Sequence, residues 1–207
     1  MAKQKKVDDG STEEKIKAAA RKLFTEKGFD AVKTRDIAAE AGINLALLNY
    51  YFRSKENLFD MVMIENFEQF IQQLIPVFGD ESLTLEERLA QITTRYIDML
   101  KANPDLPFFI MNQMRSDSSK LLSVREKMTT VREGFIKNMG KNMKGGKATR
   151  ANITHFMMNY MGLVIFPFIA RPMLMKVNGL TKKDFDDLME ERKKIIPVWL
   201  SAIMQAE

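Results

Sequence analysis

The sequence predicts an entirely α-helical protein with a small N-terminal unit and a larger helical body. Apolar residues recur at intervals of three and four through most of the chain, and no segment shows the strict alternation of a β-strand. Helix-start residues (Ser, Thr or Asn, often followed by Glu or Asp) and Gly or Pro stops bound these periodic segments. At 207 residues and 45% hydrophobic content, the chain is long enough to bury both cores.

The first unit is organised around residues 34–55, TRDIAAEAGINLALLNYYFRSK. We expect Thr34 to cap a helix that ends at Gly42, Asn44 to cap a second helix, and Ser54 to cap a third. Two short helices joined by a glycine-containing turn form a helix-turn-helix, whose second helix lies in the DNA major groove. The predicted inward-facing residues are Ile37, Ala38, Ala41, Ile43, Leu48 and Phe52.

The segment from Ile16 to Phe59, with KAAARKLFTEKGFDAVKTRDIAAEAGI and NYYFRSKENLF, resembles the N-terminal domain of TetR-family transcriptional regulators. The resemblance implies a helical homodimer with a three-helix DNA-binding head and a larger body that binds a small molecule. We therefore expect a flexible basic arm at 1–10, a helix-turn-helix domain at 11–58, and an effector-binding and dimerisation domain at 59–207. A capping box at Ser11 and Glu14 should open the first helix, which stops at Gly28.

The resemblance also implies which head residues contact DNA. The expected backbone contacts are Thr34, Tyr50, Tyr51 and Lys55, with Arg35 and Asn49 as additions. Alternatively, one of the two tyrosines packs its ring inward. The expected base contacts are Asn44, Leu45 and Ala46. The side chains of Leu45 and Ala46 can touch thymine methyl groups but have no hydrogen-bonding group, which favours an A·T-rich half-site that is read partly through DNA shape.

In the body, we expect a long helix from Ser54 to about Pro76 that links the head to the body. Five further helices should follow: Thr84 (with Glu87) to Asn103; a short proline-started helix in 105–117; Ser118 or Ser119 to Gly145; Thr149 to about Ala170, kinked or shortened by Pro167; and Thr181 (with Asp184) to about 205. The last two should pair with their copies across a homodimer interface.

An effector pocket is predicted in the body. Sixteen methionines and fourteen phenylalanines favour a cavity for an apolar ligand, although each of these residues can instead be ordinary core. The expected lining is Phe67, Phe70, Phe108, Met111, Met114, Asn159 and Tyr160, with Asn112 and Gln113 as additional polar groups.

Composition excludes several other classes of function. The chain has no cysteine and a single histidine, His155, which argues against disulfides, a transition-metal site and thiol or histidine catalysis, so we expect no cofactor and no enzyme. The charge of +5 suits an anionic partner. The N-terminus lacks the apolar core of a signal peptide, and the apolar run 156–175 is interrupted by polar residues and two prolines, which predicts a cytoplasmic protein without a membrane span.

These observations predict a ligand-responsive, sequence-specific DNA-binding regulator: a dimeric repressor released from a palindromic double-stranded operator by a small apolar effector. Two alternatives stay open at this point. One is an all-helical enzyme or carrier for a lipid-like molecule, and the other is a peripheral membrane protein that uses the methionine-rich run near 156–175.

Overall fold

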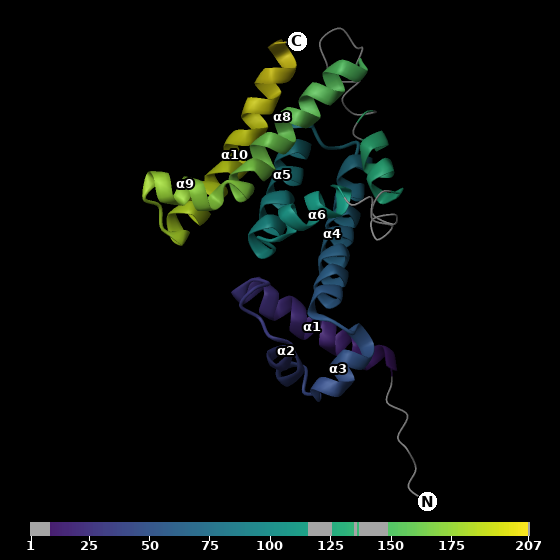
Figure 1. The fold of residues 1–207 in the computed structure, drawn as a ribbon. Coiled ribbons are helices and arrows are strands. Elements are labelled where there is room, and N and C mark those ends of the chain that lie inside the picture. The colour runs from purple at the N-terminus through teal and green to yellow at the C-terminus, as the bar shows by residue number, and fades with distance from the viewer. Residues whose placement is uncertain (1–8, 116–125, 135, 137–148, 207) are drawn as a thin grey trace, which may run out of the picture. The chain divides into compact units, whose positions relative to one another are not determined.

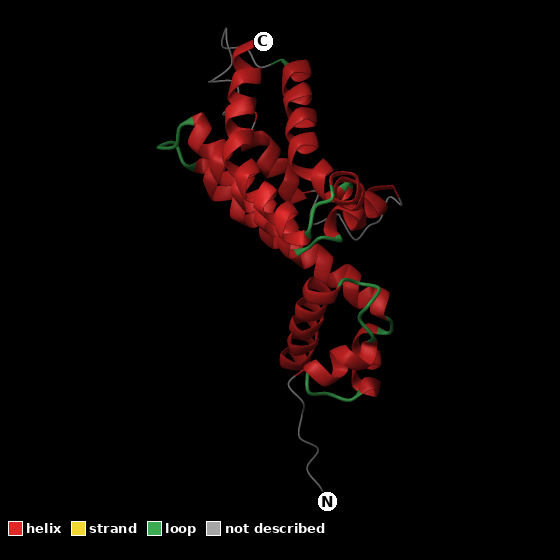
Figure 2. Ribbon diagram, turned by 90° about the vertical axis from the view of Figure 1, so that its left-hand side faces the viewer, coloured by secondary structure: helices red, strands yellow, loops and turns green. Residues whose placement is uncertain are grey.

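The computed structural model describes residues 9–115, 126–134, 136 and 149–206. Within these ranges every regular element is a helix, which confirms the all-α prediction (Figure 2). The chain divides into two compact units, residues 1–66 and residues 67–207. The helices labelled in Figure 1 are α1 (Asp9–Lys27), α2 (Thr34–Glu40), α3 (Leu45–Phe52), α4 (Lys55–Gly79), α5 (Leu85–Ala102), α6 (Leu106–Arg115), α8 (Arg150–Ile169), α9 (Arg171–Asn178) and α10 (Lys182–Ala206).

The first unit, which we call the head, contains α1, α2, α3 and the beginning of α4. Its core is made by large side chains that are almost completely buried: Ile16, Phe24, Ile37, Leu48 and Leu58. Three phenylalanine rings close the core, with Phe59 edge-on to Phe24 at 5.1 Å and 4.6 Å from Phe29 between centroids. Neither α2 nor α3 is long enough to be stable alone, so each depends on packing against this apolar core. The buried side chains therefore determine which face of each helix points outward.

Helix starts in the head only partly follow the sequence prediction. Asn44 caps α3, since its side-chain oxygen accepts a hydrogen bond from the backbone N–H of Leu47 at 2.8 Å. The start of α2 was predicted wrongly: Thr34 is its first helical residue and Lys33 is its N-cap, whose N–H donates to the Asp36 carboxylate at 3.1 Å. Ser11 does not cap α1 either, because that helix already includes Asp9.

The second unit, the body, contains most of α4 and the helices that follow it. Capping boxes form at both predicted places, Thr84 with Glu87 and Thr181 with Asp184. Helix α10 packs against α5 and α8 (Figure 1). Of the helix predicted between Ser118 and Gly145, the structure describes 126–134 and 136, and 126–134 is helical; both predicted ends lie outside the described residues.

Two body helices contain a proline close to their C-terminal ends, Pro76 in α4 and Pro167 in α8. Helix α4 continues past Pro76 to Gly79, further than predicted, because its last carbonyls are held by the buried guanidinium of Arg88. Helix α8 contains Pro167 and ends two residues later, and α9 leaves at an angle of 68°. In the described part of the chain no single helix is long and apolar enough to cross a bilayer; α8 and α9 reach that length only together, across this bend.

Candidate functional sites

The outer face of α3 is set by the two side chains that the helix buries. Leu48 and Phe52 lie in the core of the head. Helical geometry then places Ala46 and Tyr50 on the opposite side and Asn49 at its border, and all three are exposed, Tyr50 by 76%. A short helix with an apolar inner stripe therefore presents a small, polar outer surface.

The remaining predicted contacts lie at the borders of this surface. Asn44 is exposed, and Leu45 is half-buried at the start of α3. In α2, Arg35 is exposed and Thr34 is half-buried. Of the two tyrosines, Tyr50 is exposed and Tyr51 is half-buried, and their rings stand edge-on at 5.5 Å between centroids.

Lys55, a predicted phosphate contact, also forms hydrogen bonds within the head. Its ammonium donates to the backbone carbonyl oxygens of Phe29 and Val32, at 2.9 and 3.0 Å, and lies 4.0 Å from the centre of the Phe29 ring. Two of its three donors thus fix the loop between α1 and α2, leaving one for any other partner. Sequence position alone suggested a free cation.

Arg53 was missed by the sequence analysis. It is exposed directly after α3 and has a φ of 62°, a conformation that costs a residue with a side chain free energy and that clusters at functional sites. No local sequence pattern indicates that conformation, although an arginine beside the tyrosine pair has the charge that a phosphate contact needs.

Ion pairs join α1 to α4 inside the head. Lys17 is 6% exposed and its ammonium lies 2.7 Å from one carboxylate oxygen of Glu65, while Arg21 reaches the other at 3.2 Å. Burial alone would lower the pKa of Lys17, but hydrogen bonds to Glu14 and Glu65 outweigh it and raise that pKa. Lys17 therefore stays charged at neutral pH and holds the first helix of the head to the fourth.

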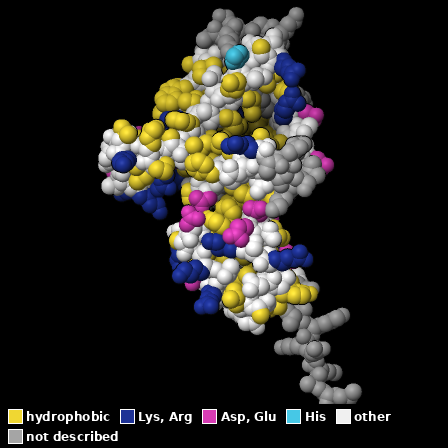
Figure 3. All heavy atoms as spheres, viewed as in Figure 1, with side chains coloured by type: hydrophobic (Ala, Val, Ile, Leu, Met, Phe, Trp, Pro, Cys, Tyr) yellow, Lys and Arg dark blue, Asp and Glu magenta, His cyan; other side chains and the backbone are white. Residues whose placement is uncertain are grey.

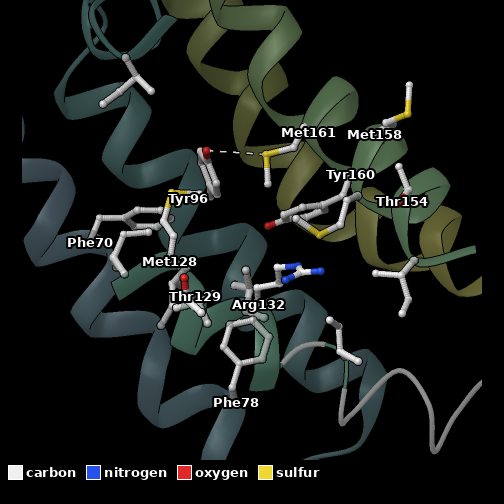
Figure 4. Close-up of a pocket in the computed structure, with 18 of the residues that line it drawn as sticks. Phe70, Phe78, Tyr96, Met128, Thr129, Arg132, Thr154, Met158, Tyr160 and Met161 are labelled. Carbon is white, nitrogen blue, oxygen red and sulfur yellow. Dashed lines mark hydrogen bonds between the residues drawn. The ribbon is translucent and has the colours of Figure 1, made fainter. Parts of the chain in front are cut away.

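A cavity of about 1040 Å³ lies within the body. This volume is at the upper end of the range of small-molecule pockets, roughly 300–1000 Å³. Figure 4 shows the walls, to which α4, α5, α6, the 126–136 segment and α8 all contribute. Most of the lining is aromatic, aliphatic or methionine: Phe67, Phe70, Ile71, Leu74, Phe78, Leu89, Ile92, Tyr96, Ile110, Met114, Met128, Val131, Ile136, Ile153, Met157, Met158, Tyr160 and Met161.

The structure brings together only part of the predicted lining. Phe67, Phe70, Met114 and Tyr160 line the cavity, as does Gln113. Phe108, Met111 and Asn159 do not, which corrects the prediction: all three are exposed and lie outside the lining. In α6 the side chains that bury against the body are Leu106, Pro107 and Phe109, so positions 108 and 111 turn to the outside. Asn112 is likewise exposed and outside the lining.

Polar groups in the cavity are few. Tyr96 and Tyr160 are buried, their ring centroids 6.3 Å apart, and burial raises the pKa of both phenols. The Tyr96 hydroxyl lies 3.9 Å from the sulfur of Met161, as drawn in Figure 4, and the Tyr160 hydroxyl lies beside the buried hydroxyl of Thr93. The sequence analysis missed Arg132 and Arg150, which also line the cavity. Arg132 follows Met128 by four residues, a spacing that places both on one face of a helix.

The last long helices expose an apolar surface. On α8, Met158 and Phe166 are 66% and 56% exposed, and on α10, Val198 and Trp199 are 55% and 43% exposed. Figure 3 shows hydrophobic side chains gathered over α8 and α9 on the face in view. Exposed apolar patches of this kind mark interaction sites. His155 is also exposed on α8.

The similarity to a known protein family lies in the head. Residues 16–62 match the family model of bacterial regulatory proteins, tetR family. The chain is 27% identical to the probable HTH-type transcriptional regulator YttP of Bacillus subtilis, over 77% of this chain and 78% of the relative.

Solved structures extend the likeness in fold to the whole chain. One is a crystal structure from Mesorhizobium loti assigned to the TetR family, with 19% identity, a TM-score of 0.64, and 96% and 98% of the two chains covered. Another is the FadR regulator of Bacillus subtilis in complex with stearoyl-CoA, with 19% identity, a TM-score of 0.52, and 88% and 96% covered. The helix-turn-helix and the family model therefore identify residues 16–62 as the N-terminal domain of tetR-family bacterial regulatory proteins, and the chain as a whole shares the fold of these solved structures.

Proposed function

We propose that this protein is a ligand-responsive transcriptional repressor that binds a palindromic DNA operator as a homodimer. One observation carries the DNA-binding part: the outer face of α3 holds Asn49 and Tyr50 in solvent while Leu48 and Phe52 anchor the helix in the head. A helix mounted in this way can enter the major groove, whose width admits one α-helix.

In the proposed complex, the start of α3 reads bases and its surroundings hold phosphates. Asn44, Leu45 and Ala46 are the base contacts, with the apolar pair against thymine methyl groups. The phosphate contacts are Thr34, Arg35, Asn49, Tyr50, Tyr51 and Arg53, with the remaining donor of Lys55 as an addition. Asn44 reads bases with its amide N–H groups, since its oxygen already caps α3.

The homodimer forms through the apolar surface of α8 and α10. These helices expose Phe166 and Trp199 although both lie in a folded body, and pairing with a second copy would bury them in a four-helix arrangement. Two-fold symmetry then presents two recognition helices to half-sites one helical turn apart, about 34–36 Å.

The ligand response is assigned to the cavity in the body. Helix α4 begins in the head at Lys55 and contributes Phe67, Phe70, Ile71, Leu74 and Phe78 to the cavity wall. A ligand that fits the cavity better when α4 has shifted releases the operator, because it moves the equilibrium by its difference in affinity for the two states. The FadR structure, which shares this fold, is a complex with stearoyl-CoA, and this supports a ligand response in a protein of this fold.

The DNA-binding part is tested by selection from random duplexes with the full chain, followed by fluorescence anisotropy at several salt concentrations. We expect an enriched inverted repeat and a Tyr50→Ala variant that binds it at least about tenfold more weakly. The matched control is Lys182→Ala, which removes an exposed cation from the body and should leave affinity unchanged. Failure to enrich any duplex, or equal loss in both variants, would contradict the proposal.

A further inference from the structure

The cavity is chemically divided. The side formed by α4 and α5 is aromatic or aliphatic, with Phe67, Phe70, Leu74 and Ile92 among its members and the Tyr96 hydroxyl as its one polar group among the described residues. The side formed by the 126–136 segment and the beginning of α8 carries the charge. There, Thr129 and Arg132 are three residues apart, and Arg150 and Thr154 are four apart, so each pair shares a helix face.

The two arginines are exposed residues of the cavity lining, and no acidic side chain of the described lining neutralises them. The cavity lining that the structure describes contains Arg132 and Arg150 and no Asp or Glu. Neither guanidinium has a hydrogen bond or ion pair with a described residue; Arg150 meets Thr154 through its backbone carbonyl, which accepts from the Thr154 hydroxyl at 2.8 Å. Figure 4 shows Arg132 reaching into the cavity beneath the ring of Tyr160.

Tyr160 is 4% exposed and also lines the cavity. Its hydroxyl lies beside the buried hydroxyl of Thr93, so this phenol does not by itself indicate a ligand, and the two arginines carry the inference.

Resting on the proposed function, we infer that the ligand of this cavity is an amphipathic anion with a long aliphatic tail. The tail lies against the aromatic and methionine wall of α4 and α5. The head group, a carboxylate or a phosphate-bearing thioester, is bound by Arg132 and Arg150. Arginine suits both head groups, since its planar fork donates two parallel hydrogen bonds to a carboxylate or a phosphate.

Competition binding to the full chain tests this inference, with 11-(dansylamino)undecanoic acid as the fluorescent probe. The competitors are palmitate, palmitoyl-CoA and hexadecan-1-ol, which has the same tail and no charge. We expect palmitate, palmitoyl-CoA or both to compete at least about tenfold better than the alcohol, because arginine forms stronger, charge-assisted hydrogen bonds with an anion than with a neutral hydroxyl group. Whichever of the two anions competes better shows whether the site binds a carboxylate or a phosphate-bearing thioester.

The double variant Arg132→Gln/Arg150→Gln should bind the alcohol as before and the anions no better than the alcohol. Arg132→Lys/Arg150→Lys keeps the charge and should retain the preference for anions, and Arg115→Gln, an exposed arginine outside the cavity, should behave as wild type. Equal competition by alcohol and anions in the wild type, or an undiminished preference in the glutamine variant, overturns the inference.

Operator binding measured on the same samples separates this inference from the proposed function. Palmitate that binds through the two arginines without changing operator affinity would overturn the ligand response and leave the anion site standing. Operator binding in a protein that none of the three competitors enters would overturn the anion site and leave the DNA-binding function standing.

Discussion

Lys55 and Arg53 are cations near the end of the helix-turn-helix whose side chains have different surroundings. In the structure Lys55 turns back to the carbonyl groups of Phe29 and Val32, whereas Arg53 remains exposed. An ammonium on a flexible stem binds whichever oxygen atoms the fold places within reach, and the sequence does not display those atoms.

The structural role of Lys55 predicts a loss of stability on removal of its charge. Lys55→Met keeps most of the aliphatic stem but leaves two carbonyl groups without their donor, so the free energy of unfolding should fall by about 1–3 kcal/mol. Urea denaturation measures the change. Lys22→Met is the control, because Lys22 pairs with Glu40 on the surface and its loss should change stability by less than about 1 kcal/mol. Equal stability of the two variants would contradict this role.

At the scale of elements, the end of α4 depends on one side chain from α5. Arg88 is 5% exposed, and its guanidinium donates to the carbonyls of Val77, Phe78, Asp80 and Leu83 at 2.6 to 3.2 Å. Carbonyls at a helix C-terminus have no partners within the helix. Arg88 supplies those partners and fixes the turn that leads from α4 to α5.

Arg88→Met should therefore lower the free energy of unfolding by about 3 kcal/mol or more, since it removes four hydrogen bonds from a buried site. Arg88→Lys should recover only part of that loss, because one ammonium cannot reach the same set of oxygens as a planar fork. Chemical denaturation of both variants, with the exposed Arg115→Met as control, gives the measurement. Full recovery by lysine would show that charge alone matters here.

Ion pairs between α5 and α10 predict a pH dependence. Hydrogen bonds from Lys101 and Lys193, at 2.5 and 2.7 Å, lower the pKa of Glu190 from 4.5 to about 2. A lowered carboxyl pKa stabilises the folded state above pH 4.5, and this contribution disappears as the pH falls from about 4.5 to about 2. The Glu190 side chain is 50% exposed, so solvent screening keeps the contribution small.

Glu190→Gln should lower the free energy of unfolding by at most about 1 kcal/mol at pH 7, and the difference from wild type should vanish near pH 2. Thermal unfolding at both pH values checks this, with the neighbouring exposed Glu191→Gln as the control that should show no such trend. A difference that grows on acidification would contradict the assigned direction of the pKa shift.

At the scale of the whole molecule, the proposed function requires a second copy. Phe166→Glu places a charge on the exposed apolar surface of α8 and should convert the dimer to a monomer in light scattering, because burying an unpaired carboxylate opposes association. Operator affinity should fall with it, since one recognition helix reads only one half-site. Ile75→Glu, at an exposed apolar position of α4, should leave the dimer intact. A dimer that survives Phe166→Glu would exclude this surface as the interface.

Local signals in the sequence determined most of the helices. The apolar spacing, the capping boxes at Thr84 and Thr181, and the cap at Asn44 all act within four residues, and the structure contains each of them. The head was also recognisable as a helix-turn-helix, because Leu48, Phe52 and Gly42 are required by short helices that meet at a tight turn.

Contacts between distant residues were decided only by the tertiary structure. The bond from Arg88 to the end of α4, the turning of Lys55 into the head, the exposure of Phe108 and Met111, and the meeting of Arg132 with Arg150 at one cavity all depend on how helices roll and pack. Helical periodicity places a residue on one side of its own helix. Which neighbour that side meets depends on all the other helices at once, and a linear pattern does not contain that information.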